Sequence, residues 1–239
     1  MRACLIAWVT LLAACTGGNS LAGSFSISPV RVFLEPRQRA AALTIVNGAD
    51  TEVVLQADVL RWSQDGTGQD RLEPSDDVIV SPPILKVPAQ GRQVVRLARL
   101  VAPHPQRQLT YRLLLREVPD TSRATQPGAS LPIALVLSIP IFLSPAGAQP
   151  DVRCELQAGQ PPQVACRNDG RAYAQLRELS VLREGQTLGR FEGVVYLLAG
   201  THRVLPLQPG DPAAWIPGEA QIQLRLEDLR PRSFAATLP

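Results

Sequence analysis

One uncharged segment, residues 131–145 (LPIALVLSIPIFLSP), restricts what this chain of 239 residues can fold into. Side chains of a β-strand alternate between two faces, and one face here would carry only leucine and isoleucine. Its members are Leu131, Ile133, Leu135, Leu137, Ile139, Ile141 and Leu143. Proline cannot donate to a hydrogen-bond ladder, so Pro132 and Pro140 favour an edge strand. A long apolar edge needs a cover. We expect that cover to be another protein; the alternative is an ordinary buried strand.

The composition favours an all-β protein built from short strands. The chain has 22 prolines and 17 glycines, with 45% hydrophobic but only 5% aromatic residues. About seven apolar segments precede residue 145, which is typical of an immunoglobulin-like sandwich, and a similar pattern restarts after it. We therefore expect two immunoglobulin-like β-sandwich domains, at residues 24–145 and 146–239, the second one smaller. The net charge of +3 is dispersed, which argues against nucleic acid as a partner.

The N-terminus indicates export. A positive start at Arg2 and a short apolar run precede small residues around Ala22, as in a secretory signal peptide cleaved near that position. We expect residues 1–23 to be this signal. The alternative is a lipobox, LAAC, that would make Cys15 the lipidated first residue of the mature protein.

The cysteines predict one disulfide. Two of the four, Cys4 and Cys15, lie in the targeting segment, which leaves Cys154 and Cys166. In an exported protein, two cysteines on either side of a turn-rich stretch are expected to form a disulfide. A metal pair is the alternative, but neither of the two histidines is near.

Catalytic patterns are scarce. His104 and His202 lack a neighbouring nucleophile, and the sequence has no GxSxG, HExxH or glycine-rich phosphate loop. Asp76 and Asp77 have the pattern of a solvated turn. We expect no enzymatic activity, no metal and no cofactor, and we interpret the chain as a binding module.

Arg31 is the most informative charged residue. It shares a predicted strand face with Phe25, Ile27 and Phe33. A cation among apolar neighbours is costly unless it meets an anion. Two partners remain open at this stage: a carboxylate of the chain itself, or an anion supplied by a ligand.

Five motifs carry a family resemblance. They are SPVRVFLEP, LTIVN, VIVSPPILKVPAQGRQVVRL, YRLLLREVP and LPIALVLSIPIFLSP, in this order over about 120 residues. Their order and spacing resemble those of the periplasmic pilus-assembly chaperones of the chaperone–usher pathway, in particular the archaic, spore-coat-protein-like branch. The resemblance implies two immunoglobulin-like domains arranged in an L shape, a periplasmic location, and pilus subunits and an outer-membrane usher as partners.

The resemblance also implies a mechanism, donor-strand complementation. The chaperone lends a strand to a subunit whose own sandwich lacks one. The side chains that would fill the subunit's groove are Leu131, Ile133, Leu135 and Leu137. Whether the free protein caps this edge by forming a homodimer stays open. The alternatives to a chaperone are a secreted pilus subunit or surface adhesin, and an exported β-sandwich enzyme or carbohydrate binder.

Arg31 matches the family's cleft arginine, which binds the subunit's C-terminal carboxylate. A guanidinium suits this task because it donates two parallel hydrogen bonds. The family's best-known members add a lysine on the lent strand, where this chain has Pro140. Either Arg31 acts alone, or Arg96 or Arg112 assists it.

Two further positions are expected to be structural. Glu117 matches a family glutamate that forms an interdomain salt bridge, but the usual arginine partner is Ser144 here, so this network must be rewired or absent. Adjacent prolines at Pro82 and Pro83 indicate a kinked strand, with a cis Ser81–Pro82 bond as one way to form it.

Overall fold

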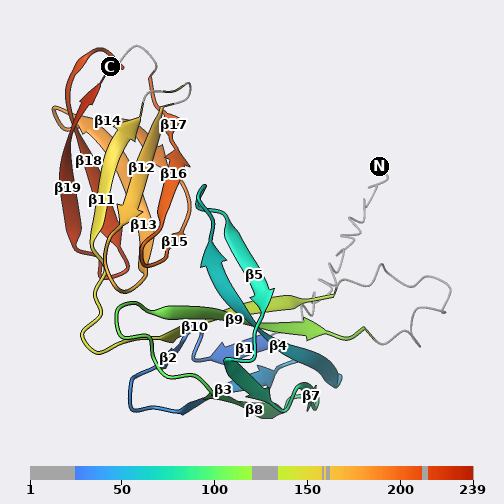
Figure 1. Ribbon diagram of the computed structural model, residues 1–239. Helices are drawn as coiled ribbons and strands as arrows, with labels where there is room; N and C mark the ends of the chain where they lie inside the picture. Colours follow the sequence, from blue (N-terminus) through green and yellow to red (C-terminus); the bar gives the residue numbers. More distant parts are fainter. Residues whose placement is uncertain (1–24, 120–133, 158, 160–161, 212–214, 239) are drawn as a thin grey trace, which may run out of the picture.

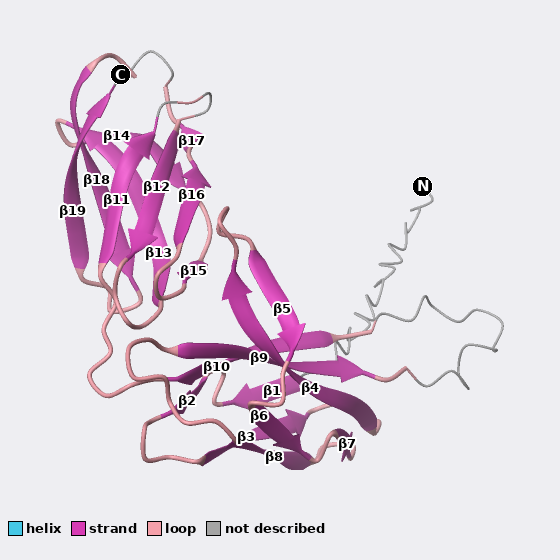
Figure 2. Ribbon diagram, viewed as in Figure 1, coloured by secondary structure: helices cyan, strands magenta, loops and turns pink. Residues whose placement is uncertain are grey.

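The computed structural model describes residues 25–119, 134–157, 159, 162–211 and 215–238. Every regular element among them is a β-strand (Figure 2). The strands form four sheets, which confirms the predicted all-β class. No described helix has the length and apolar character that a membrane crossing would need. The predicted signal sequence, with Cys15 and Ala22, lies outside the described residues.

The first domain contains two sheets. Sheet 1 has the order β1 (Phe25–Ser28), β3 (Ala40–Asn47), β8 (Arg92–Arg99) and β6 (Val78–Ser81). Sheet 2 has the order β2 (Val32–Leu34), β10 (Val136–Leu143), β9 (Leu109–Glu117), β4 (Val53–Gln64) and β5 (Asp70–Pro74), with β7 (Ile84–Val87) also paired to β4. The two sheets pack face to face around one aliphatic core, to which both contribute fully buried leucine, isoleucine and valine.

The segment expected as one strand, residues 24–34, is divided between the two sheets. β1 pairs antiparallel with β3 in sheet 1, whereas β2 pairs parallel with β10 in sheet 2. The crossing contains a cis Ser28–Pro29 peptide bond. The switch also changes which side chains face the core: Val32 and Leu34 are buried in it, and Arg31 points away from it.

The second domain has its own pair of sheets. Sheet 3 has the order β11 (Val152–Gln157), β12 (Gln163–Asn168) and β16 (His202–Pro206). Sheet 4 has the order β17 (Gln208–Pro209), β14 (Gln186–Phe191), β13 (Ala174–Arg183), β18 (Gly218–Leu226) and β19 (Pro231–Leu238), with β15 (Val195–Leu197) also paired to β13. The apolar pattern after residue 145 predicts β11, β12, β13, β15, β16 and β18, but not β14, β17 or β19. Glycine, proline and small side chains lower the local β-propensity of the strands that were not predicted. These strands form because they pair with neighbouring strands of sheet 4.

The domains meet at an angle, as expected for an L shape (Figure 1). The β4–β5 hairpin extends from the first domain along the side of the second. A small third cluster lies at the junction, where Trp62 and Phe142 of the first domain pack against Tyr173 and Leu198 of the second. This junction places β10, β9 and β2 beside the second domain.

Candidate functional site

The strand β10 is only partly covered. It pairs antiparallel with β9 over its whole length, from Val136 to Leu143. On its other side, β2 pairs only with residues 141–143. Within the described part of the chain, no strand covers that side of residues 136–140 (Figure 1). The predicted edge strand is therefore present, and its open portion is the N-terminal half of β10.

Backbone hydrogen bonds show which groups face the open side. The Glu117 N–H donates to the Leu135 carbonyl at 2.9 Å, and the Ser144 N–H donates to Leu34 of β2 at 3.4 Å. Residues alternate in an antiparallel ladder, so odd-numbered positions bond to β9 and even-numbered ones face away from it. Val136 and Ser138 therefore direct their backbone groups to the open edge. Pro140 is also an even-numbered position, so its missing N–H would have faced the open edge. The proline therefore removes no hydrogen bond to β9.

The aliphatic row of β10 continues the core of the first domain. Ile139, Ile141 and Leu143 are buried in that core, and Leu137 packs against it while half-buried. Leu135 is also half-buried. The predicted fillers Leu131 and Ile133 lie outside the described residues. Ile139, Ile141 and Leu143 are therefore covered by the protein's own core, and not by another protein as expected for the whole segment.

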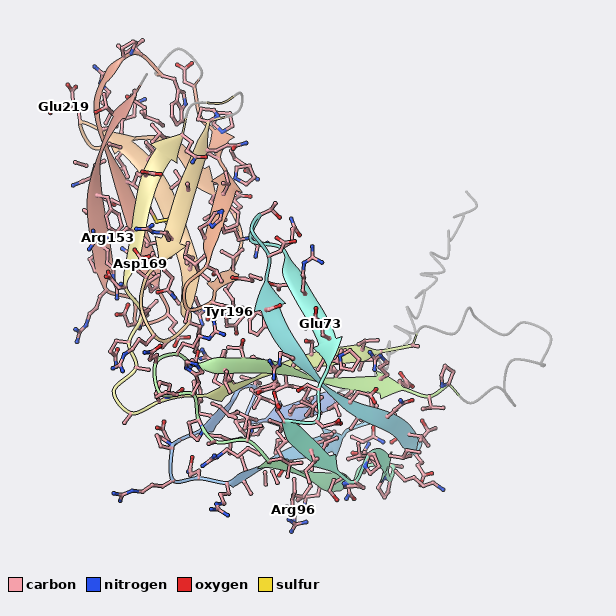
Figure 3. The ribbon with its side chains drawn as sticks, viewed as in Figure 1. Glu73, Arg96, Arg153, Asp169, Tyr196 and Glu219 are labelled. Atoms are coloured by element: carbon pink, nitrogen blue, oxygen red, sulfur yellow. A yellow bond between two sulfur atoms is a disulfide. The ribbon has the colours of Figure 1, made fainter. Side chains whose placement is uncertain are left out.

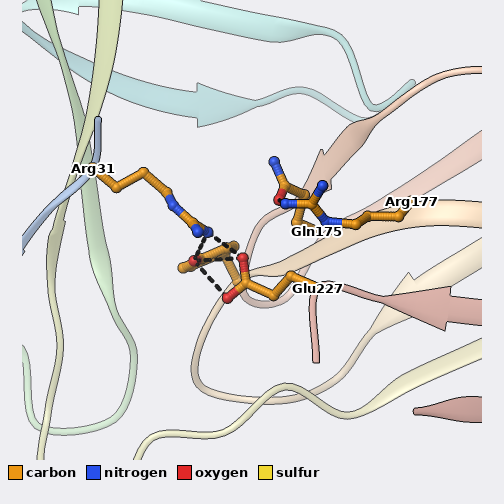
Figure 4. A network of polar contacts seen from close by, with 5 residues as sticks. Arg31, Gln175, Arg177 and Glu227 are labelled. Carbon is orange, nitrogen blue, oxygen red and sulfur yellow. Dashed lines mark hydrogen bonds and ion pairs between the residues drawn. The ribbon is translucent and has the colours of Figure 1, made fainter. Parts of the chain in front are cut away.

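Arg31 lies between the two domains. Its Nη1 donates to the Tyr173 hydroxyl at 3.0 Å and forms an ion pair with Glu227 (Figure 4). The Tyr173 hydroxyl in turn lies 3.0 Å from Glu227 Oε1. Burial alone would lower the pKa of Arg31, but the hydrogen bond and charge of Glu227, with Tyr173, outweigh it and raise the pKa. The sequence left two anionic partners open for Arg31, an internal carboxylate or a ligand. The structure contains the internal one, Glu227.

Arg112 lies directly across from Pro140 in the β9–β10 ladder. Its guanidinium carbon is 3.7 Å from the centre of the Trp62 ring and 5.2 Å from that of Tyr196. Within the described residues it forms no ion pair, although the Asp70 carboxylate acts on its charge. Burial lowers its pKa from the usual arginine value. Arg112 is therefore a cation held by aromatic faces, at the position where Pro140 cannot supply one.

Arg96 is not part of this site. It lies on β8 in sheet 1, is exposed, and is at the side of the first domain away from the second (Figure 3). Its side chain therefore cannot assist Arg31 in this arrangement.

The junction concentrates positive charge around Tyr196. Burial raises the pKa of this phenol, while Arg31, Arg112 and Arg177 act to lower it and Glu227 to raise it. Three arginines thus act on one phenol together with a single carboxylate. Arg177 comes from the second domain, and its Nη2 donates to the Gln175 amide oxygen at 3.2 Å (Figure 4).

Aromatic rings line the same cleft. Phe142 of β10 stacks on Tyr173 with ring centres 4.0 Å apart, and Trp62 meets the Tyr196 ring edge-on at 5.1 Å. The Trp62 Nε1 is buried and has no hydrogen-bond partner among the described residues. The alternation in residues 131–145 did not predict that Phe142, on the other face of β10, would be buried by another domain.

The predicted hinge network is rewired. Ser144 accepts a hydrogen bond from Gln108 Nε2 at 2.7 Å, and Gln108 Oε1 accepts one from the Tyr173 N–H at 3.0 Å. Glu117 lies at the opposite end of β9, where its carboxylate accepts a bond from the Leu135 N–H at 3.2 Å. The structure therefore does not bring Glu117 to the hinge. Gln108 joins the domains instead, and an isolated glutamine carries no sequence signal for that role.

The other structural predictions are met. The Ser81–Pro82 bond is cis, between β6 and β7. Cys154 and Cys166 form a disulfide between directly paired positions of β11 and β12, with Cα atoms 4.1 Å apart. Among the described residues, no group of histidine, cysteine, aspartate or glutamate side chains is arranged to hold a metal ion.

The comparisons with known proteins identify the family. Residues 24–149, more than half of the chain, match the family described as pili and flagellar-assembly chaperone, PapD N-terminal domain. The chain belongs to this family. Its members are assembly chaperones and not enzymes, in agreement with the expectation from the sequence motifs.

Two curated relatives are similar over part of the chain. One is the probable fimbrial chaperone LpfB of Escherichia coli O157:H7, 28% identical over 134 residues, which are 56% of this chain and 55% of that protein. The other is the chaperone protein LpfB of Salmonella typhimurium, 27% identical over 61% of this chain and 60% of that protein. The chain thus spans little more than half the length of these relatives.

Solved structures agree on the fold over both domains. The CsuC–CsuE chaperone–subunit complex from archaic Csu pili of Acinetobacter baumannii matches with a TM-score of 0.67 and 19% identity, covering 89% of this chain and 98% of that one. The complex of the SafA pilin with the SafB chaperone of Salmonella enterica matches with a TM-score of 0.59 and 16% identity, covering 90% and 96%. This likeness confirms the two-domain, immunoglobulin-like chaperone fold.

Proposed function

We propose that this protein is a periplasmic chaperone of the chaperone–usher pathway, which captures pilus subunits, completes their fold and delivers them to an outer-membrane usher. Family membership supports the chaperone role. The CsuC and SafB chaperones, which share its fold, were solved in complex with subunits, as their descriptions state. The CsuC likeness and the SIPIFLSP motif together support assignment to the archaic branch.

The observation that carries this proposal is the open edge of β10 at residues 136–140. An incoming strand would pair with the outward backbone groups of Val136 and Ser138, so the chaperone's sheet would continue into the subunit. The row Leu131, Ile133, Leu135 and Leu137 would then enter the subunit's groove. Burying one such side chain is worth about 1.5–3 kcal/mol, so the row provides a large gross gain before the costs of association.

Arg31 and Arg112 are the proposed anchor for the subunit's terminal carboxylate. Arg112 compensates for the missing lysine at Pro140, because directly opposed side chains of an antiparallel pair lie on the same face, about 4.5–5.5 Å apart at Cβ. It also forms no ion pair with a carboxylate of the described residues, although the charge of Asp70 acts on it. Arg96 has no part in this anchor.

Processing and assembly complete the proposal. Residues 1–23 would direct export and be removed by cleavage near Ala22, leaving a chaperone domain at 24–145 that carries the donor strand and a second domain at 146–239. Lipidation at Cys15 would instead tether the protein to a membrane, and the mass of the mature N-terminus distinguishes the two. In the free protein, a homodimer formed edge to edge would protect β10 from aggregation.

Replacing a single residue tests the open edge. In Val136→Pro, one outward N–H is removed while the bonds to β9 remain. We expect about five- to tenfold weaker capture of a co-expressed pilus subunit, measured by co-purification and titration. Val136→Thr keeps the N–H and the β-branched shape and should capture normally.

A second variant tests the side-chain row at residues 131–137. Ile133→Asp combined with Leu135→Asp should abolish capture, because two carboxylates would have to enter an apolar groove. Circular dichroism establishes that the variants are folded. Normal capture by folded Val136→Pro and by the double variant would refute strand donation.

A further inference from the structure

The carboxylate of Glu227 pairs with the guanidinium of Arg31, which the proposed function assigns to the subunit's terminal carboxylate. Arg31 belongs to the crossing between β1 and β2, and Glu227 follows the last residue of β18 in the second domain. The two side chains form an ion pair, and the Tyr173 hydroxyl contacts both (Figure 4). The anion partner inferred for Arg31 is therefore present inside the free protein.

We propose that Glu227 is an internal competitor of the subunit's terminal carboxylate, so that it sets the affinity of the cleft for its ligand. This inference rests on the proposed function. A glutamate side chain and a peptide C-terminus present the same group to a guanidinium, with the same charge and two acceptor oxygens. Because Glu227 already engages Arg31 Nη1, a ligand carboxylate must displace it to gain the same bond.

The pair is accessible enough to exchange. The side chain of Arg31 is 28% exposed and that of Glu227 is 36% exposed. Removing one partner of a buried ion pair is costly because the other charge is left buried and unpaired. Water reaches both groups here, so opening this pair does not have that cost.

The second domain also provides a place for the displaced carboxylate. The guanidinium of Arg177 points toward the same network (Figure 4), and its described partner is the neutral amide of Gln175. Arg177 and Glu227 both act on the Tyr196 phenol, which places them around one group. Arg177 is therefore the cation that we assign to the displaced Glu227 carboxylate.

The exchange involves the strand that the chaperone lends. Tyr173, which bridges Arg31 and Glu227, stacks on Phe142 of β10 with ring centres 4.0 Å apart. Release of Glu227 removes one of the two partners of the Tyr173 hydroxyl. Glu227 is thus linked to β10 indirectly, through the Tyr173 hydroxyl and the stacking of Tyr173 on Phe142.

Binding of two matched peptides to the full-length mature chain tests the proposal. The probes are a nine-residue peptide of alternating valine and threonine with a free C-terminal carboxylate, and the same peptide with a C-terminal amide. Glu227→Gln keeps the size and the acceptor for Tyr173 but removes the charge. We expect this variant to bind the carboxylate peptide about three- to fivefold more tightly, and the amide peptide as the unmodified protein does.

Two controls make the result specific. Glu219→Gln, at the far end of β18 (Figure 3), changes net charge equally and should have no effect. In an Arg31→Ala background, Glu227→Gln should no longer strengthen binding. If the unmodified protein prefers the carboxylate peptide but Glu227→Gln binds it equally or more weakly, Glu227 only supports the hinge and the inference is wrong. If the unmodified protein does not distinguish the peptides, the carboxylate anchor of the proposed function fails as well.

Discussion

At the scale of single residues, the partners of polar side chains are set by tertiary contacts and not by neighbouring sequence. The sequence indicated that Arg31 needs an anion, yet Glu227 is 196 positions away and carries no motif. Asp77, interpreted from the sequence as part of a solvated turn, instead accepts a hydrogen bond from the Tyr111 hydroxyl at 2.8 Å and pairs with Arg61. Only Asp76, its exposed neighbour, fits the turn interpretation.

Asp77 should make the first domain sensitive to acid. Burial alone would raise its pKa, but hydrogen bonds from Tyr111 and Arg61 outweigh it, so the pKa is lowered. A depressed carboxylate pKa stabilises the fold above the unfolded value of about 4 and loses this effect as pH falls through the folded pKa. Asp77→Asn should lower the unfolding free energy at pH 7 by about 1 kcal/mol and flatten its decline between about pH 5 and 3. Urea titrations at several pH values measure both; Asp76→Asn is the control, and an unchanged slope in Asp77→Asn would contradict the prediction.

At the scale of elements, strand pattern and strand pairing carry different information. The alternation in residues 131–145 predicted which side chains of β10 form one aliphatic face, because that face depends on local side-chain order. It did not predict that residues 24–34 would divide into β1 and β2, because the apolar alternation runs on through the crossing. β11 and β12 were both expected, and their exact opposition at Cys154 and Cys166 explains how the disulfide forms.

Removing the disulfide should destabilise the second domain. Replacing both Cys154 and Cys166 with alanine opens a loop with a sequence separation of 12 residues, and the chain-entropy argument predicts a loss of about 2–3 kcal/mol in its unfolding free energy. Differential scanning calorimetry with and without a reducing agent measures the change. The reducing agent should have no effect on the double variant. An unmodified protein whose transition is equally insensitive to reduction would count against the bond.

At the scale of the whole molecule, the β4–β5 hairpin helps to set the angle between the domains. Gln64 at the end of β4 binds the second domain three times: its Nε2 donates to the Tyr196 carbonyl at 2.9 Å, and its Oε1 accepts from the Leu198 N–H at 3.0 Å and the Thr201 hydroxyl at 2.8 Å. The hairpin turn then approaches the backbone of β16 closely at Gly68. These contacts hold the cleft that contains Arg31 and Arg112 in its present shape.

A methyl group at Gly68 should loosen this arrangement. A Cβ there would lie 2.7 Å from the His202 carbonyl oxygen, and the φ of +79° is one that other residues rarely adopt. In Gly68→Ala the hairpin must withdraw, and we expect a larger radius of gyration by small-angle X-ray scattering and weaker subunit capture. Gly66→Ala, in the same turn but with no atom within 4 Å of its Cβ, should change neither. Scattering curves for Gly68→Ala that match those of the unmodified protein would show that the hairpin does not set the angle.

The sequence by itself determined the all-β class, the aliphatic face of β10, the disulfide and the family, because each depends on local alternation, cysteine number or motif order. The tertiary structure alone decided that Arg31 pairs with Glu227, that Arg112 rests on Trp62 opposite Pro140, that Gln108 links the domains, and that Glu117 and Arg96 lie elsewhere. These outcomes depend on how two sandwiches dock. Docking joins side chains that are far apart in the chain, and no periodicity in the sequence records such distances.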